Sequence, residues 1–265
     1  MKRLFLGFCA IAAFTFYSCD STKTNQENQT TATDESATTE NTISIAPVTD
    51  FPEYNDAMLD MNAPIDGAQL PSDSISFSYN VKNFELGAQT DNNEMNLANS
   101  GDGQHIHLIF NNQPYHAKYT PEFKMKLDEG HYVALSFLSR SYHMSVKNPD
   151  AYVLRQFTVG DAEAEDIDLS GPLMFYSRPK GDYSGADTEN LLLDFYLVNT
   201  ELSENGNKVR ATINGQEFIL TDWQPYAIQG LPLGEVTIKL ELIDADGNVI
   251  DGPYNTVERT VTLKE

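Results

Sequence analysis

Ser74-Ile-Ser-Phe-Ser-Tyr-Asn-Val81 carries an apolar side chain at every second position. Because successive side chains of a strand point to opposite faces, this period of two predicts a β-strand with one buried face. Glycine- and asparagine-containing turns separate it from further runs rich in β-branched and aromatic residues. These runs lie at 105–110, 132–138, 152–159, 191–198, 209–213, 236–243 and 257–263. No stretch after residue 50 keeps a helical apolar period for three turns, so the sequence predicts an all-β fold.

The predicted strands repeat at the scale of a domain. Four pairs of segments correspond in the same order: 81–86 with 197–202, 107–113 with 210–216, 119–121 with 223–225, and 127–130 with 231–234. Two halves of about 100–115 residues have the size of an immunoglobulin-like sandwich. They resemble the cysteine-free immunoglobulin-like domains of bacteria, and this resemblance implies tandem sandwiches at 46–160 and 161–265 without implying a ligand.

The amino terminus has the composition of an export signal. Met1-Lys-Arg3 precedes an apolar run from Leu4 to Tyr17, which is too short to cross a bilayer as a permanent helix. We therefore predict a signal peptide at 1–18. The chain has two cysteines, Cys9 and Cys19, so the remainder cannot form disulfides, thiolate metal sites or cysteine nucleophiles.

Phe16-Tyr-Ser-Cys19 resembles the lipobox of bacterial lipoproteins, in the looser form found in Bacteroidota. The resemblance implies that Cys19 carries palmitate and related acyl chains, which would anchor the protein to a membrane. The expected location is the cell outer membrane, facing either the periplasm or the surface. Ordinary secretion with an unmodified Cys19 is the alternative.

The segment 19–45 is predicted to be the lipidated cysteine followed by a disordered tether. Its side chains are almost all small and polar, and such a segment cannot bury enough apolar surface to offset the entropy lost on ordering.

Charge excludes one class of partner. The chain has 39 acidic and 17 basic residues and a formal net charge of −22. A surface this acidic repels the phosphates of nucleic acid, so we predict no nucleic-acid binding.

Histidines are the sharpest indication of a site, because all five lie between residues 105 and 143. In His105-Ile-His107 the alternation places both imidazoles on one face of a strand, opposite the apolar face, close enough to ligate one ion. His143 and Met144 follow the next predicted strand and could add donors from a loop. Imidazole suits copper and zinc, so the pattern predicts a surface metal site. The alternative is a polar strand face whose histidines bind no ion.

A second candidate site is the cluster of Arg140, Ser141 and Lys147, with donors suited to an anion. A polar hairpin end explains the same residues. A third is a platform of aromatic side chains for a glycan, for which packing in the core is the alternative. Its members would be Tyr115, Tyr119, Tyr142, Tyr183, Trp223 and Tyr226.

Enzymatic patterns are weak. Ser177-Arg-Pro-Lys180 has the Ser-x-x-Lys form but lacks the companion motifs that give it meaning. Asp244-Ala-Asp-Gly-Asn248 lacks the alternating ligands of a calcium loop and predicts a hairpin turn. We therefore expect no enzyme but a lipid-anchored binding or interaction protein of the cell envelope, with an unidentified protein, glycan or small-molecule ligand. Binding of copper or zinc through the histidines is the alternative function.

Overall fold

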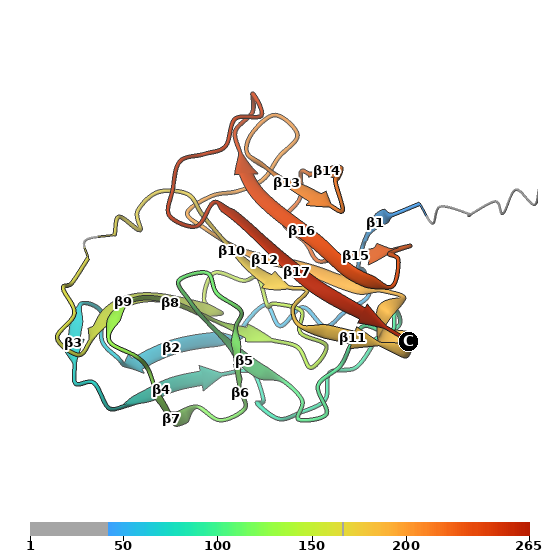
Figure 1. Cartoon of the computed structure of the whole chain (residues 1–265). Coiled ribbons are helices and arrows are strands. Elements are labelled where there is room, and N and C mark those ends of the chain that lie inside the picture. Colours follow the sequence, from blue (N-terminus) through green and yellow to red (C-terminus); the bar gives the residue numbers. More distant parts are fainter. Residues whose placement is uncertain (1–41, 166) are drawn as a thin grey trace, which may run out of the picture. The chain divides into compact units, whose positions relative to one another are not determined.

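The structure is a computed structural model, and it describes residues 42–165 and 167–265. These residues form seventeen β-strands and a single turn of 3-10 helix at Gly185–Thr188. The all-β prediction is confirmed (Figure 1). Within the described ranges, no helix has the length and apolar character needed to span a bilayer.

The first sandwich consists of two sheets built from the first half of the chain. A three-stranded sheet has the order β2-β4-β7, and a five-stranded sheet has the order β3-β9-β8-β5-β6. The strands are β2 (Met58–Ala63), β3 (Ala68–Leu70), β4 (Ser74–Lys82), β5 (His105–Phe110), β6 (His116–Lys118), β7 (Glu122–Lys126), β8 (Gly130–Ser139) and β9 (Tyr152–Val159).

The second sandwich repeats this arrangement. Its sheets have the orders β1-β15-β12-β10 and β11-β17-β16-β13-β14. The strands are β1 (Ser44–Pro47), β10 (Leu173–Arg178), β11 (Asp182–Ser184), β12 (Leu191–Val198), β13 (Lys208–Ile213), β14 (Gln216–Leu220), β15 (Tyr226–Gln229), β16 (Gly234–Ile243) and β17 (Thr256–Lys264).

Strand order shows the duplication directly. Strands β10 to β17 correspond in order to strands β2 to β9, and apart from the added β1 the two halves have the same strand order in their sheets. In each half one pair is parallel: β3 with β9 in the first, and β11 with β17 in the second. All other strand pairs are antiparallel, as in immunoglobulin-like sandwiches. All eight runs predicted from the sequence are strands in the structure.

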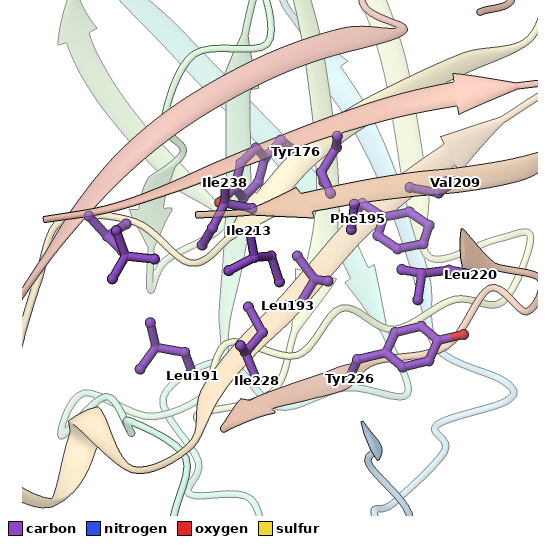
Figure 2. Close-up of a cluster of buried hydrophobic side chains, with 14 of the residues drawn as sticks. Tyr176, Leu191, Leu193, Phe195, Val209, Ile213, Leu220, Tyr226, Ile228 and Ile238 are labelled. Carbon is purple, nitrogen blue, oxygen red and sulfur yellow. The ribbon is translucent and has the colours of Figure 1, made fainter. Parts of the chain in front are cut away.

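Each sandwich encloses its own apolar core. In the first, Phe77 of β4 packs among side chains from the five-stranded sheet, including Phe110 and Phe157. In the second, Leu193 and Phe195 of β12 face Ile213 and Ile238 (Figure 2). The alternation seen in Ser74–Val81 therefore does bury one face of β4.

A third apolar layer joins the two sandwiches. Side chains on the other face of β8, such as Leu135 and Phe137, pack with Phe175 of β10 and Tyr196 of β12. The rings of Phe137 and Tyr196 stack with centroids 4.6 Å apart. Strands β5, β10 and β12 are therefore buried on both faces, in contrast to the one-sided burial of β4.

The predicted tether and domain boundaries differ from the structure at one point. We expected 19–45 to be tether and the first domain to begin at 46, but Ser44–Pro47 form β1, which pairs with β15 of the second sandwich. Gly230, directly after β15, has a φ of +75°, and a Cβ there would lie 2.4 Å from the Thr42 carbonyl oxygen. The approach of β1 therefore requires glycine at this position. The predicted signal peptide and Cys19 lie outside the described residues.

An ion pair also crosses between the sandwiches. Asp194 on β12 is fully buried, and its carboxylate accepts hydrogen bonds from Lys147 Nζ at 2.6 Å and from the Ser145 hydroxyl at 2.9 Å. The lysine side chain is 15 % exposed. Removing one partner leaves the other charge unpaired in the interior.

We expect Asp194→Leu to destabilise the protein by about 3 kcal/mol, because it leaves the Lys147 ammonium without its buried counterion. The double variant Asp194→Leu/Lys147→Met should recover much of this loss, since no unpaired charge remains. Urea unfolding of the three proteins measures both quantities. A double variant as unstable as the single one would contradict the assignment of the cost to the unpaired charge.

Candidate metal centre

Three histidine side chains converge in the first sandwich. His105 and His107 lie two residues apart on β5, so both imidazoles leave the strand on the same face. His143 comes from the loop that follows β8. One ring nitrogen of each histidine lies within 4.8 Å of the others. The structure therefore brings together the three imidazoles that the sequence analysis grouped.

His105 stands at the centre of this group. Its Nε2 atom is 2.9 Å from His107 Nε2 and 3.1 Å from His143 Nδ1. Two nitrogens that ligate one zinc or copper ion at about 2.0–2.1 Å lie roughly 2.8–3.4 Å apart for ligand angles of about 90–110°. The two separations that involve His105 fall in that range, and they also suit hydrogen bonds between neutral rings.

In His105 and His107, the ring nitrogens that point away from the centre have partners of their own. His105 Nδ1 lies 2.8 Å from the Gly103 carbonyl oxygen, which can only accept, so Nδ1 carries the proton and the lone pair of Nε2 faces the centre. His107 Nδ1 lies 3.1 Å from the Ser177 hydroxyl of β10. Ligating histidines in metalloproteins are oriented by outer hydrogen bonds of this kind.

Burial of the group corrects the sequence-based expectation. We predicted a surface site, whereas His105 and His107 have 0 % exposed surface. The reason is the layer between the sandwiches, which covers the face of β5 opposite its own core. The ring of Tyr115 stacks on His107 with centroids 3.5 Å apart, and Tyr119 lies 5.0 Å from His105. His143 is less buried than the other two histidines.

The loop conformation aims His143 at the centre. Its backbone nitrogen donates to the Arg140 carbonyl at 2.9 Å, and its φ is +67°. Positive φ values are uncommon for residues other than glycine, and histidine is among the residue types enriched there. Tyr115 Oη lies 3.1 Å from His143 Nδ1, the same atom that faces His105.

The surroundings keep all three imidazoles neutral. Burial is the main cause that lowers the pKa of His105 to about 4; the hydrogen bond to Gly103 opposes it, and Arg178 and Lys180 add to it. Burial also holds the pKa values of His107 and His143 well below the ordinary value. Neutral imidazole is the form that binds metal ions. No carboxylate joins the group within the described parts of the chain.

Met144 does not belong to this centre. Its side chain is fully buried in a separate apolar cluster with Val48, Leu97 and Leu192. Adjacent residues of an extended loop project in different directions, so sequence proximity to His143 did not make it a ligand. The predicted thioether donor is therefore a core residue.

The predicted anion cluster is also used internally. Arg140 is buried and donates to the carbonyls of Pro52 and Ser145, while Lys147 pairs with Asp194. The Ser141 hydroxyl accepts from the backbone of Thr90 at 3.1 Å. Arg140 and Lys147 do line one cavity of about 470 Å³, together with Phe51 and Trp223, but Ser141 does not.

The predicted aromatic platform is not assembled. Four of its six members are buried, each at most 5 % exposed, and their rings pack in different apolar clusters. These four are Tyr115, Tyr142, Tyr183 and Tyr226. The alternative of core packing is the correct one for them.

The remaining polar candidates have structural partners. His131 is held by Thr158 and Gln156, and His116 lies exposed on β6. Asp244 accepts from the backbone of Asp246 and Asn248, as the predicted hairpin turn requires.

Sequence reasoning missed the second sandwich's contribution to the centre. Ser177 and Lys180 were noticed only as an incomplete Ser-x-x-Lys motif, and Tyr115 only as an exposed aromatic residue. The one available signal was the run of apolar residues just before Ser177, which marks a strand with two buried faces.

Comparisons with known proteins leave the centre unassigned. No protein-family model and no curated protein matches the chain. Among solved structures, the fibronectin(III)-like modules of Clostridium thermocellum CbhA match at 13 % identity and a TM-score of 0.28, over 78 % of this chain and 94 % of that one. The D00-D0 domain of Intimin matches at 11 % identity and 0.24, over 78 % and 100 %.

A third solved structure is the glucan-utilization protein SGBP-B of Bacteroides ovatus in complex with a mixed-linkage heptasaccharide. It matches at 15 % identity and a TM-score of 0.23, over 83 % of this chain and 47 % of that one. Likenesses at this level say nothing about the ligand of this chain.

Burial of the neutral imidazoles predicts a pH effect on stability. The histidines have an ordinary pKa near 6.5 when unfolded and a lowered pKa when folded, so protons bind the unfolded chain first as the pH falls. In chelator, the free energy of unfolding should therefore fall between pH 6.5 and 5, by up to about 1.4 kcal/mol per pH unit for each histidine. Urea unfolding at several pH values tests this, and His107→Gln should reduce the slope. An unfolding free energy constant over this range would contradict it.

Proposed function

We propose that the protein binds a copper or zinc ion through His105, His107 and His143. The observation that supports this proposal is the convergence of three ring nitrogens around His105 Nε2, with the Nδ1 atoms of His105 and His107 facing Gly103 and Ser177. Three neutral nitrogen donors match the preferences of Cu(II) and Zn(II). Since Met144 lies in the core, the donor set lacks the soft thioether that would favour Cu(I).

Three protein ligands leave a fourth position for water or another ligand. In zinc proteins, four protein ligands are typical of structural sites, and three are typical of sites that exchange a ligand. We propose a role in binding or transfer of the ion rather than a purely structural one.

The imidazoles can bind a metal ion without changing their charge, because a neutral ring can carry its proton on either nitrogen. In the metal-free protein, His105 Nε2 can accept from both neighbouring rings if these carry their protons at the facing nitrogens. To ligate an ion through the facing nitrogens, His107 would carry its proton at Nδ1, where the Ser177 hydroxyl can accept it, and His143 would carry its proton at Nε2. A hydroxyl donates or accepts equally well, so Ser177 supports both states.

We further propose that this binding protein works at the cell envelope, held to the outer membrane by lipid on Cys19. The charged start, the short apolar run and the lipobox-like segment support this setting. The proposed role is binding without catalysis, and any larger protein, glycan or small-molecule ligand is unidentified.

Substituting His105 and His107 together by alanine should weaken copper and zinc binding by more than about 100-fold, because two of three ligands are lost. Isothermal titration calorimetry on tag-free, chelator-treated full-length protein measures this. His116→Ala is the matched control, since His116 lies exposed on the neighbouring strand β6 and should leave the affinity unchanged. Equal binding by the double variant and the control would overturn the metal proposal.

Replacing Cys19 by serine should release the protein from the membrane fraction of the producing bacterium, because the acyl chains would have no thiol to attach to. Fractionation and mass spectrometry of the amino-terminal peptide detect the change. Membrane association that persists in Cys19→Ser, without lipid on the wild-type peptide, would rule out the anchor.

A further inference from the structure

A separate hollow lies near the metal centre, between the two sandwiches. It has a volume of about 230 Å³ and is lined by the turn between β5 and β6, the turn between β10 and β11, and strand β17. Lys180 and Arg259 contribute the basic side chains of its wall, with Asn112, Gln113 and Thr260 beside them. Glu258 also borders the hollow.

The basic residues at this place lack acidic partners. Ion pairs among the described residues join Lys147, Arg210, Lys239 and Lys264 to carboxylates, but none involves Lys180, Arg259 or the neighbouring Arg178. In a chain with 39 acidic and 17 basic residues, three cations gathered without a carboxylate contact require a physical explanation.

Aromatic faces hold these cations in place instead. Lys180 Nζ lies 3.8 Å from the centre of the Tyr115 ring and donates to the Tyr115 carbonyl at 2.7 Å. The Arg259 guanidinium lies 4.3 Å from the centre of the Tyr176 ring, and its Nη2 donates to the Asn112 carbonyl at 3.0 Å. These contacts position the charges without neutralising them.

Hydrogen-bonding capacity at the cluster is also unfilled. Arg259 Nη1 and Arg178 Nε are buried with no hydrogen-bond partner among the described residues. An ammonium has three N–H donors, and in the described part of the chain Lys180 Nζ donates to a single oxygen, the Tyr115 carbonyl. Burial and the repulsion from Arg178 and Arg259 lower the pKa of Lys180 to about 8. A bound anion would relieve this repulsion.

We propose that this hollow binds a small tetrahedral oxyanion, phosphate or sulfate, through Lys180 and Arg259. The Lys180 ammonium and the Arg259 guanidinium both border the hollow and offer the charge-assisted hydrogen bonds that such an anion accepts. The volume suits an ion of this size or the terminal group of a phosphate or sulfate ester. The site is distinct from the three histidines and does not depend on the proposed metal function.

The test is calorimetric titration of the chelator-treated full-length protein with inorganic phosphate, inorganic sulfate and acetate at constant ionic strength. We expect phosphate and sulfate to bind more tightly than the planar acetate. Lys180→Met and Arg259→Gln should each weaken phosphate binding at least about tenfold, because each removes one charge-assisted contact. A sugar phosphate in a parallel titration distinguishes a terminal ester group from the free ion.

Lys264→Met is the matched control. Lys264 lies on the same strand as Arg259, pairs with Asp182 and does not line the hollow, so its removal should leave phosphate affinity unchanged. Thermal unfolding establishes that each variant is folded. If Arg259→Gln does not fold, Lys180→Met alone tests whether the hollow binds phosphate. Absence of phosphate binding would overturn the proposal. Equal binding by wild type, Lys180→Met and Lys264→Met would also overturn it, because it would mean adventitious surface binding only.

Discussion

One contact determines which polar groups of this protein are buried. It is the packing of the five-stranded sheet of the first sandwich against the β10–β12 sheet of the second. A sheet in an isolated sandwich has one face in the core and one in water. Here Phe137 and Tyr196 meet across a third apolar layer, so both faces of β5, β8, β10 and β12 are occupied. Polar groups placed on those faces must find partners inside the protein.

That layer gives the histidine centre its chemical character. His107 would lie on a solvated strand face without it, as the corresponding Arg210 of the second half does, where the guanidinium pairs with Glu241. Enclosure removes water from the imidazoles, keeps them neutral and brings Ser177 within reach of His107. The duplicated strand thus contributes to a partly exposed ion pair in one copy and to a buried nitrogen cluster in the other.

Local patterns predicted the strands well, because a period of two in Ser74–Val81 or an Asn-Gly turn depends on neighbouring residues alone. The same rule placed His105 and His107 on one face and allowed His143 to join them. Burial of that face was not predictable in this way, since it depends on β10 and β12, about seventy residues later in the chain. Met144 and the pairing of Ser44–Pro47 with β15 were missed for the same reason: each depends on contacts distant in sequence.

The position of β1 has a mechanical consequence. Ser44–Pro47 pair with Tyr226–Gln229, yet the chain passes directly from there into the first sandwich at Met58. A pull arriving through the residues ahead of Ser44 would therefore load the β1–β15 hydrogen bonds before any strand of the first sandwich. Under such a force, the β1–β15 pairing would carry the load first and protect the first sandwich and its histidines from being pulled apart.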